Sequence, residues 1–218
     1  MKYVVQKLLA TMLLGTLLAL PVLAKQQADG VVSWDFDVYL DDKRVGTHRF
    51  EVSEAEGTKY VQSEASFNYK ILFISAFRYD HKAAERWTDN CLVEFAASTN
   101  TNGKELRVSG EQSGEGFIVD KGDDAFSLPE CVMTFAYWNR DFLNQPRLLN
   151  PQTGEYVDVS VEEIGGELLE VRGKPVPATR FKLTAKRIDL TLWYSPDNEW
   201  LALESVAKGG RVIRYELT

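Results

Sequence analysis

The chain has 218 residues, with 25 lysines and arginines against 32 aspartates and glutamates, and a formal net charge of −7. Proline and glycine make up about a tenth of it, which excludes a collagen-like chain or a low-complexity linker. The acidic balance argues against a nucleic-acid-binding protein, which needs a basic face.

The first 24 residues have the pattern of a secretory signal peptide. Lys2 and Lys7 precede an apolar run from Leu8 to Leu20, and small or modest residues lead to Ala24. The run is short for a bilayer span, which needs about 20 apolar residues. We therefore expect cleavage after Ala24 and a mature chain, residues 25–218, that is exported and not integral to the membrane. Loss of the two lysines makes its formal charge −9.

Alternation of apolar and polar residues, the period of a half-buried strand, begins soon after this segment. Residues 32–40 place Trp34, Phe36 and Val38 on one face. A polar turn at 41–44 follows, and the next run places His48, Phe50 and Val52 on one face. This pattern predicts a β-hairpin with a distinct inner and outer side.

Residues 71–77 break the alternation and are mostly apolar. They are either a strand covered on both faces or an exposed edge or flap. Residues 78–89 resume a strand-like pattern, and Asn102-Gly103 is the strongest hairpin signal in the chain.

Residues 130–143 are the best candidate for a short helix, because Pro129 and Glu130 suit a first turn. The remaining chain reads as a meander of strands joined by short turns. We predict a mainly β protein: a single antiparallel β-roll or incomplete β-barrel over residues 25–218, with one short helix near 130–143.

Cys91 and Cys131 are the only cysteines. In an exported chain they favour a disulfide over two isolated thiols, and a redox pair is disfavoured because catalytic pairs are usually spaced Cys-x-x-Cys. The bridge would close a loop of about 40 residues and contribute on the order of 3–4 kcal/mol. Sequence alone leaves the two buried thiols open as an alternative.

Motifs for known chemistry are missing from the sequence. It has no P-loop, dinucleotide fingerprint or nucleophile elbow, and it indicates no cofactor. A metal site is poorly supported, since His48 and His81 are the only histidines and neither has a second ligand at helical spacing. His48 shares the face of Phe50, so it is either a base or ligand contact in a cavity or a hydrogen-bonded core histidine. His81 lies in a polar stretch, and we expect it to be solvated.

Aromatic residues exceed what a small core requires. A curved sheet lined with them can hold an apolar ligand, although filling the interior of the roll is the simpler role. The residues that we expect to contact a ligand are His48, Phe73, Phe77, Trp87, Trp138 and Trp193.

Several motifs together resemble a known family. They are residues 34–40 (WDFDVYL) with Gly46, Cys91-Leu92, residues 99–103 (TNTNG), residues 137–139 (YWN), residues 148–150 (LLN) with Thr153-Gly154, and residues 189–194 (DLTLWY). With the leader, they are similar to an uncharacterised family of exported proteins from Gram-negative bacteria, a domain of unknown function. A more distant likeness is to spiral β-roll exported domains. The resemblance implies the fold and a periplasmic location, and it supplies no catalytic residues.

Three functions are compatible with these features. The first is a non-enzymatic periplasmic protein that binds an apolar or amphipathic, lipid-like ligand on the concave face of the roll. The second is a structural or protein-interaction module of the cell envelope, which predicts an exposed apolar patch or pairing edge and no cavity. The third is a hydrolase that uses His48 with a nearby acid.

Overall fold

The computed structural model describes residues 30–218 apart from residues 72–73, 115 and 208. The expected signal peptide, residues 1–24, lies outside this range, and so does Phe73 of the expected ligand contacts. Within the described ranges, no helix is long and apolar enough to cross a membrane.

Strands dominate the described residues, and their inner faces follow the predicted alternation. In chain order they are β1 (Val32–Leu40), β2 (Lys43–Ala55), β3 (Thr58–Ile71), β4 (Ile74–Thr88), β5 (Cys91–Thr101), β6 (Lys104–Ser113), β7 (Gly116–Asp120), β8 (Ala125–Leu128), β9 (Arg147–Leu149), β10 (Tyr156–Val171), β11 (Lys174–Ala185), β12 (Ile188–Tyr194), β13 (Trp200–Val206) and β14 (Val212–Leu217). In β1, for example, Trp34, Phe36 and Val38 are buried between partly exposed neighbours.

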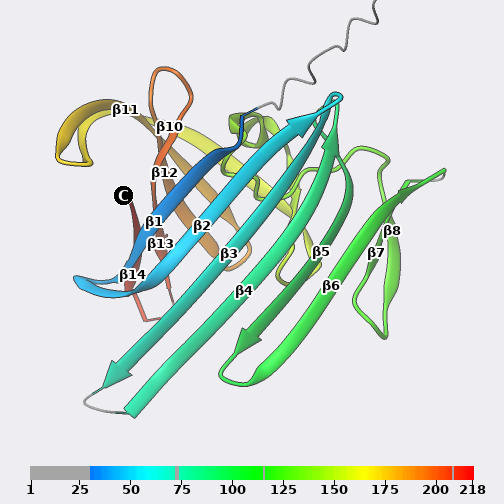
Figure 1. Ribbon diagram of the computed structural model, residues 1–218, viewed down its shortest axis with the longest axis horizontal. Coiled ribbons are helices and arrows are strands. Elements are labelled where there is room, and N and C mark those ends of the chain that lie inside the picture. Colours follow the sequence, from blue (N-terminus) through cyan, green and yellow to red (C-terminus); the bar gives the residue numbers. More distant parts are fainter. Residues whose placement is uncertain (1–29, 72–73, 115, 208) are drawn as a thin grey trace, which may run out of the picture.

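All these strands join one antiparallel sheet in the described part of the chain, in the order β8-β7-β6-β5-β4-β3-β2-β1-β14-β13-β12-β11-β10-β9. Each half is a meander, and pairing of β1 with β14 joins the two halves. Strands β1 to β3 lie in front of β10 to β13, so the sheet curls over itself (Figure 1). Because β8 and β9 stay at its two edges, the sheet is an open roll, which confirms the predicted fold class.

The predicted Asn102-Gly103 hairpin is confirmed. Both residues have positive φ, 53° and 86°, and they connect β5 to β6. Two such residues in succession give the backbone the twist that a tight antiparallel hairpin needs.

The short helix predicted near 130–143 is present, but it is shorter and begins later than expected. Only η1 (Arg140–Asn144), a short 3-10 helix capped by Asn139, forms there. The carbonyl of Val132 accepts from Leu92, and the carbonyl of Met133 accepts from Leu149. These two carbonyl groups are thus hydrogen-bonded to neighbouring strands and are not available to a helix. Residues 132–134 are also buried in succession, which a one-sided helix cannot achieve.

Residues 129–146, here named the closing segment, cross one end of the roll. The Cys91–Cys131 disulfide ties it to β5, which confirms the predicted pairing. Further on, Arg140 hydrogen-bonds Asn198 in the turn between β12 and β13, and the Tyr194 hydroxyl donates to the carbonyl of Tyr137 at 2.8 Å. The closing segment therefore spans from one side of the roll to the other.

Gly46 lets β2 and β3 approach each other. A Cβ atom at this position would lie 1.9 Å from the backbone oxygen of Ser66. We expect Gly46→Ala to lower the free energy of unfolding by about 3 kcal/mol or more, because two paired strands would have to separate. Urea denaturation measures the loss. Gly166→Ala is the matched strand control, since its Cβ would come no closer than 3.4 Å to any atom, and equal losses in both variants would contradict the prediction.

Candidate ligand-binding cavity

A cavity of about 340 Å³ lies inside the roll. Its walls come from the inner faces of β2 to β4, from the opposite strands β12 to β14, from the closing segment and from the loop at 150–152. Most of the lining is apolar or aromatic, with few polar groups, which is the usual make-up of small-molecule sites. The volume is also within the usual range for such sites.

The cavity has a closed end and a mouth. At the closed end, Glu85 of β4 and Val61 of β3 are paired neighbours, and Phe135 to Trp138 of the closing segment cover them. Phe77, farther back along β4, also lines the cavity and is exposed, so it marks the mouth. From Phe77 to Glu85 the strand covers ~26 Å at the usual rise of a β-strand. A cavity of about 340 Å³ that extends over this length is a narrow channel.

His48 lies in this lining, on the inner face that its alternation predicts, and is buried. Its Nε2 is 2.8 Å from the Ser63 hydroxyl, and its Nδ1 is 3.4 Å from the Tyr215 hydroxyl. Burial lowers the pKa of His48 to about 3, with a smaller effect from nearby His81. The imidazole is therefore neutral near neutral pH, as a hydrogen-bonded core histidine would be.

The expectation that His81 is solvated is wrong. Only 3% of the residue is exposed, and its Nδ1 is 2.9 Å from the Thr99 hydroxyl. His81 shares the inner face of β4 with Tyr79 and Ala83, so its polar sequence neighbours point to the other side of the sheet. Burial lowers the pKa of His81 to about 4, so this ring is also neutral.

Glu85 is a functional candidate that the sequence reasoning missed. Its carboxylate accepts a hydrogen bond from the Trp87 indole at 2.9 Å and another from the Thr134 hydroxyl. Burial raises the pKa of Glu85 to about 7, and these two hydrogen bonds only partly oppose that effect. Glu85 is two residues from both Ala83 and Trp87, so strand alternation places it on the same face of β4 as these buried residues. This alternation is the signal in the sequence that could have revealed it.

The cavity brings together three of the expected ligand contacts: His48, Phe77 and Trp138. Trp87 is 1% exposed and lies behind Glu85, with its ring 5.6 Å from the ring of Trp138. Trp193 lies elsewhere and donates its indole N–H to Glu167. The indole nitrogen of Trp138 is buried, and it has no hydrogen-bond partner among the described residues.

The hydrogen bond between Ser63 and His48 resembles the start of a catalytic triad. The third member, however, is a tyrosine hydroxyl instead of a carboxylate, and burial raises the pKa of Tyr215. A histidine with a pKa near 3 is a weak general base at neutral pH. The arrangement therefore favours binding over hydrolysis.

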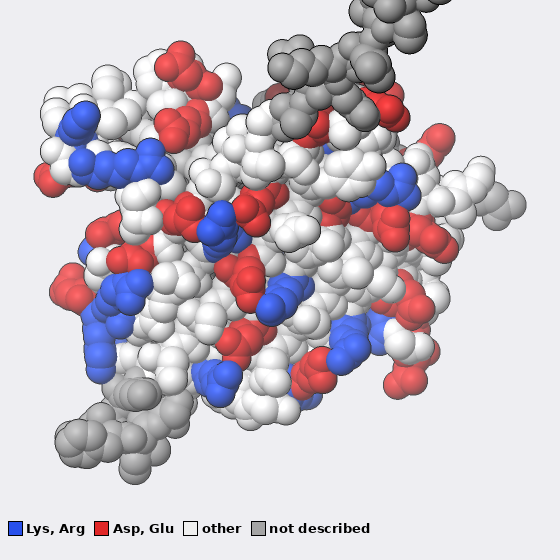
Figure 2. All heavy atoms as spheres, in the orientation of Figure 1, with Lys and Arg blue, Asp and Glu red and all other residues white. Residues whose placement is uncertain are grey.

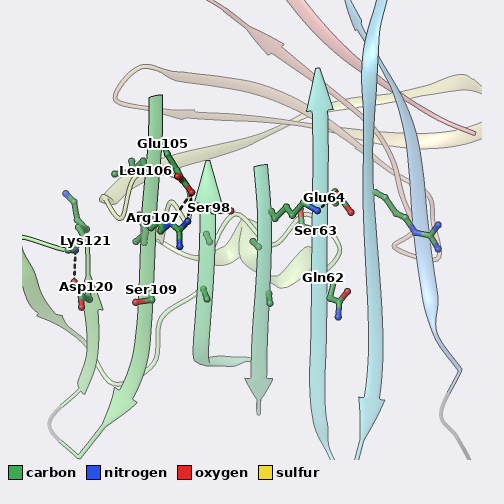
Figure 3. A pocket seen from close by; sticks show the side chains of 18 of the residues that line it. Gln62, Ser63, Glu64, Ser98, Glu105, Leu106, Arg107, Ser109, Asp120 and Lys121 are labelled. Carbon is green, nitrogen blue, oxygen red and sulfur yellow. Dashed lines mark hydrogen bonds and ion pairs between the residues drawn. The ribbon is translucent and has the colours of Figure 1, made fainter. Parts of the chain in front are cut away.

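A second hollow, of about 930 Å³, lies open on the outer face of β2 to β7. Figure 3 shows its labelled side chains on β3, β5, β6 and β7, with Glu64, Ser98 and Arg107 among them. Ion pairs border it, such as Lys82 with Glu64 at 2.6 Å and Arg107 with Glu105 at 2.8 Å. Figure 2 shows the same mixture of positive and negative side chains over these strands. This face has the character of an ordinary solvated sheet surface.

Comparison with known proteins bears on the family and the fold. Residues 36–218 match the model of a family described as a domain of unknown function, DUF6134. The chain belongs to the DUF6134 family. This membership confirms the expected resemblance to a family without an assigned activity. A search of curated proteins finds no match.

Among solved structures, the DUF6134 domain is similar to a beta-barrel-like protein of domain of unknown function DUF1849 from Brucella abortus. The TM-score is 0.64 at 10% identity, and the match covers 85% of this chain and 94% of that chain. At this identity the likeness shows the fold alone.

Proposed function

We propose that this protein is an exported, non-enzymatic binding protein of the periplasm, which holds an apolar or amphipathic, lipid-like ligand in the cavity of the roll. The observation that carries the proposal is the channel between Phe77 and Glu85, which is lined mainly by apolar and aromatic groups. The alternative role as a structural module of the envelope predicts a filled interior, so the cavity supports binding over it. The leader pattern and the disulfide support export, since disulfides persist in oxidising compartments.

Filling the channel should abolish binding. Ala83 is buried on the inner face of β4 and lines the cavity, so Ala83→Phe would place a ring in the ligand's path. We expect at least a tenfold loss of affinity for phenylnaphthylamine, a neutral apolar dye, since a filled cavity can no longer bury it. Fluorescence titration of the folded proteins measures the affinity.

The neighbouring residue supplies the control. Ala84 is exposed on the outer face of β4, so Ala84→Phe adds the same ring outside the cavity. We expect this variant to bind the dye like the unmodified protein. Unchanged affinity in Ala83→Phe, or no dye binding by the unmodified protein, would refute the proposed function.

A further inference from the structure

The closed end of the cavity combines one acid with several aromatic rings. Glu85 is the only aspartate or glutamate among the described residues that line the cavity. Four rings also line the cavity: Phe50 of β2, and Phe135, Tyr137 and Trp138 of the closing segment. The Tyr137 ring centroid lies 6.5 Å from that of Phe50 and 6.4 Å from that of Phe135, so the rings form a connected wall.

The carboxyl of Glu85 has no basic partner in the described part of the chain. Its two hydrogen bonds come from neutral groups, the Trp87 indole and the Thr134 hydroxyl. Arg187 is the only lysine or arginine among the described lining residues. Its side chain is 74% exposed and pairs with Glu155 at 3.5 Å. Glu85 is only partly buried, in the lining of the cavity. A carboxylate removed from bulk water in this way is still costly unless a positive charge accompanies it.

The two histidines of the cavity do not supply that charge. Burial holds the pKa of His48 near 3 and that of His81 near 4, so both rings are neutral above about pH 5. The phenols of Tyr79 and Tyr137 have pKa values raised by burial, so they also stay neutral. Near neutral pH, a charge can therefore form at the closed end only on Glu85.

We propose that the closed end binds the ammonium group of a single-chain amphiphile, with Glu85 as its counter-ion and the rings of Phe135, Tyr137 and Trp138 around it. This inference rests on the proposed function and names the ligand class. Aromatic rings with a carboxylate are the groups that recognise organic cations, because the ring faces carry negative charge density. The apolar chain then extends along β4 towards Phe77, past Phe67 and Ile213.

Ligands of equal chain length test the proposal. Calorimetry at about pH 8, where Glu85 is ionised, compares decyltrimethylammonium with decanol, each below the concentration at which it aggregates. We expect the cation to bind at least about tenfold more tightly than the alcohol, because only the cation gains the carboxylate and the ring faces. Glu85→Gln should remove this preference and leave decanol affinity within about twofold, since glutamine keeps an acceptor for Trp87.

Two further variants complete the test. Glu94→Gln removes one negative charge from the outer face, where Glu94 pairs with Arg86, and should change neither affinity. Phe135→Leu keeps an apolar side chain but removes a ring face, so it should lower the affinity for the cation and leave the affinity for decanol unchanged. This variant replaces Glu85→Gln in the test if Glu85→Gln does not fold. Equal binding of cation and alcohol by the unmodified protein would overturn the proposal and leave the proposed function standing. Binding of neither ligand would overturn both.

Discussion

Replacing both Cys91 and Cys131 with alanine is expected to lower the free energy of unfolding by about 4 kcal/mol. The disulfide joins residues 40 positions apart, and releasing a loop of that length restores conformational entropy to the unfolded chain. The bridge also anchors the start of the closing segment to β5, next to the hydrogen bond from Leu92 to Val132. Loss of the bridge should therefore weaken the closed end of the cavity first.

Urea denaturation with and without reductant measures this effect. The unmodified protein should lose the same stability when it is reduced, whereas the double variant should not respond to reductant. Hydrogen exchange should report faster opening of residues 132–149 than of β2 and β3. A stability loss below about 1 kcal/mol would show that the bridge contributes little beyond the contacts around it.

The second large effect is a pH dependence of stability that two substitutions change in opposite directions. The pKa values of His48 and His81 are lowered to about 3 and 4, so the unfolded chain binds two more protons there between about pH 4.5 and 6.5. The pKa of Glu85 is raised to about 7, so in that window the folded protein holds one extra proton. The unfolded state thus binds a net excess of one proton, and stability falls as the pH falls.

This balance predicts three slopes. For the unmodified protein, the free energy of unfolding should drop by about 1 kcal/mol per pH unit between pH 6.5 and 4.5. His48→Gln removes one of the two histidine protons and should make the profile nearly flat. Glu85→Gln removes the opposing proton and should steepen the drop to about 3 kcal/mol per pH unit. Urea titrations at several pH values measure all three, and parallel profiles would contradict the burial of these groups.

Much of the fold was predictable from local sequence pattern. The alternation around Trp34 and Phe36 identified the inner faces, and Asn102-Gly103 identified a hairpin, because both signals depend on near neighbours. The helix prediction failed at residues 130–139 because this segment bonds to two other strands. One strand begins at Cys91 and the other ends at Leu149, and backbone groups of the segment hydrogen-bond to both. A short amphipathic pattern does not reveal such partners.

The sequence by itself determined most of the inward-facing residues, since a strand alternates its side chains whatever surrounds it, but it misplaced His81, whose sequence neighbours are polar. It placed His48, Phe77 and Trp138 among the candidates because rings on one face must pack or line something. Only the tertiary structure decided that a cavity exists and that Glu85 lies at its closed end with no lysine or arginine partner among the described residues. The reason is that the cavity is formed by β2 to β4, the closing segment and β12 to β14 together, and their separation depends on how the whole sheet curls.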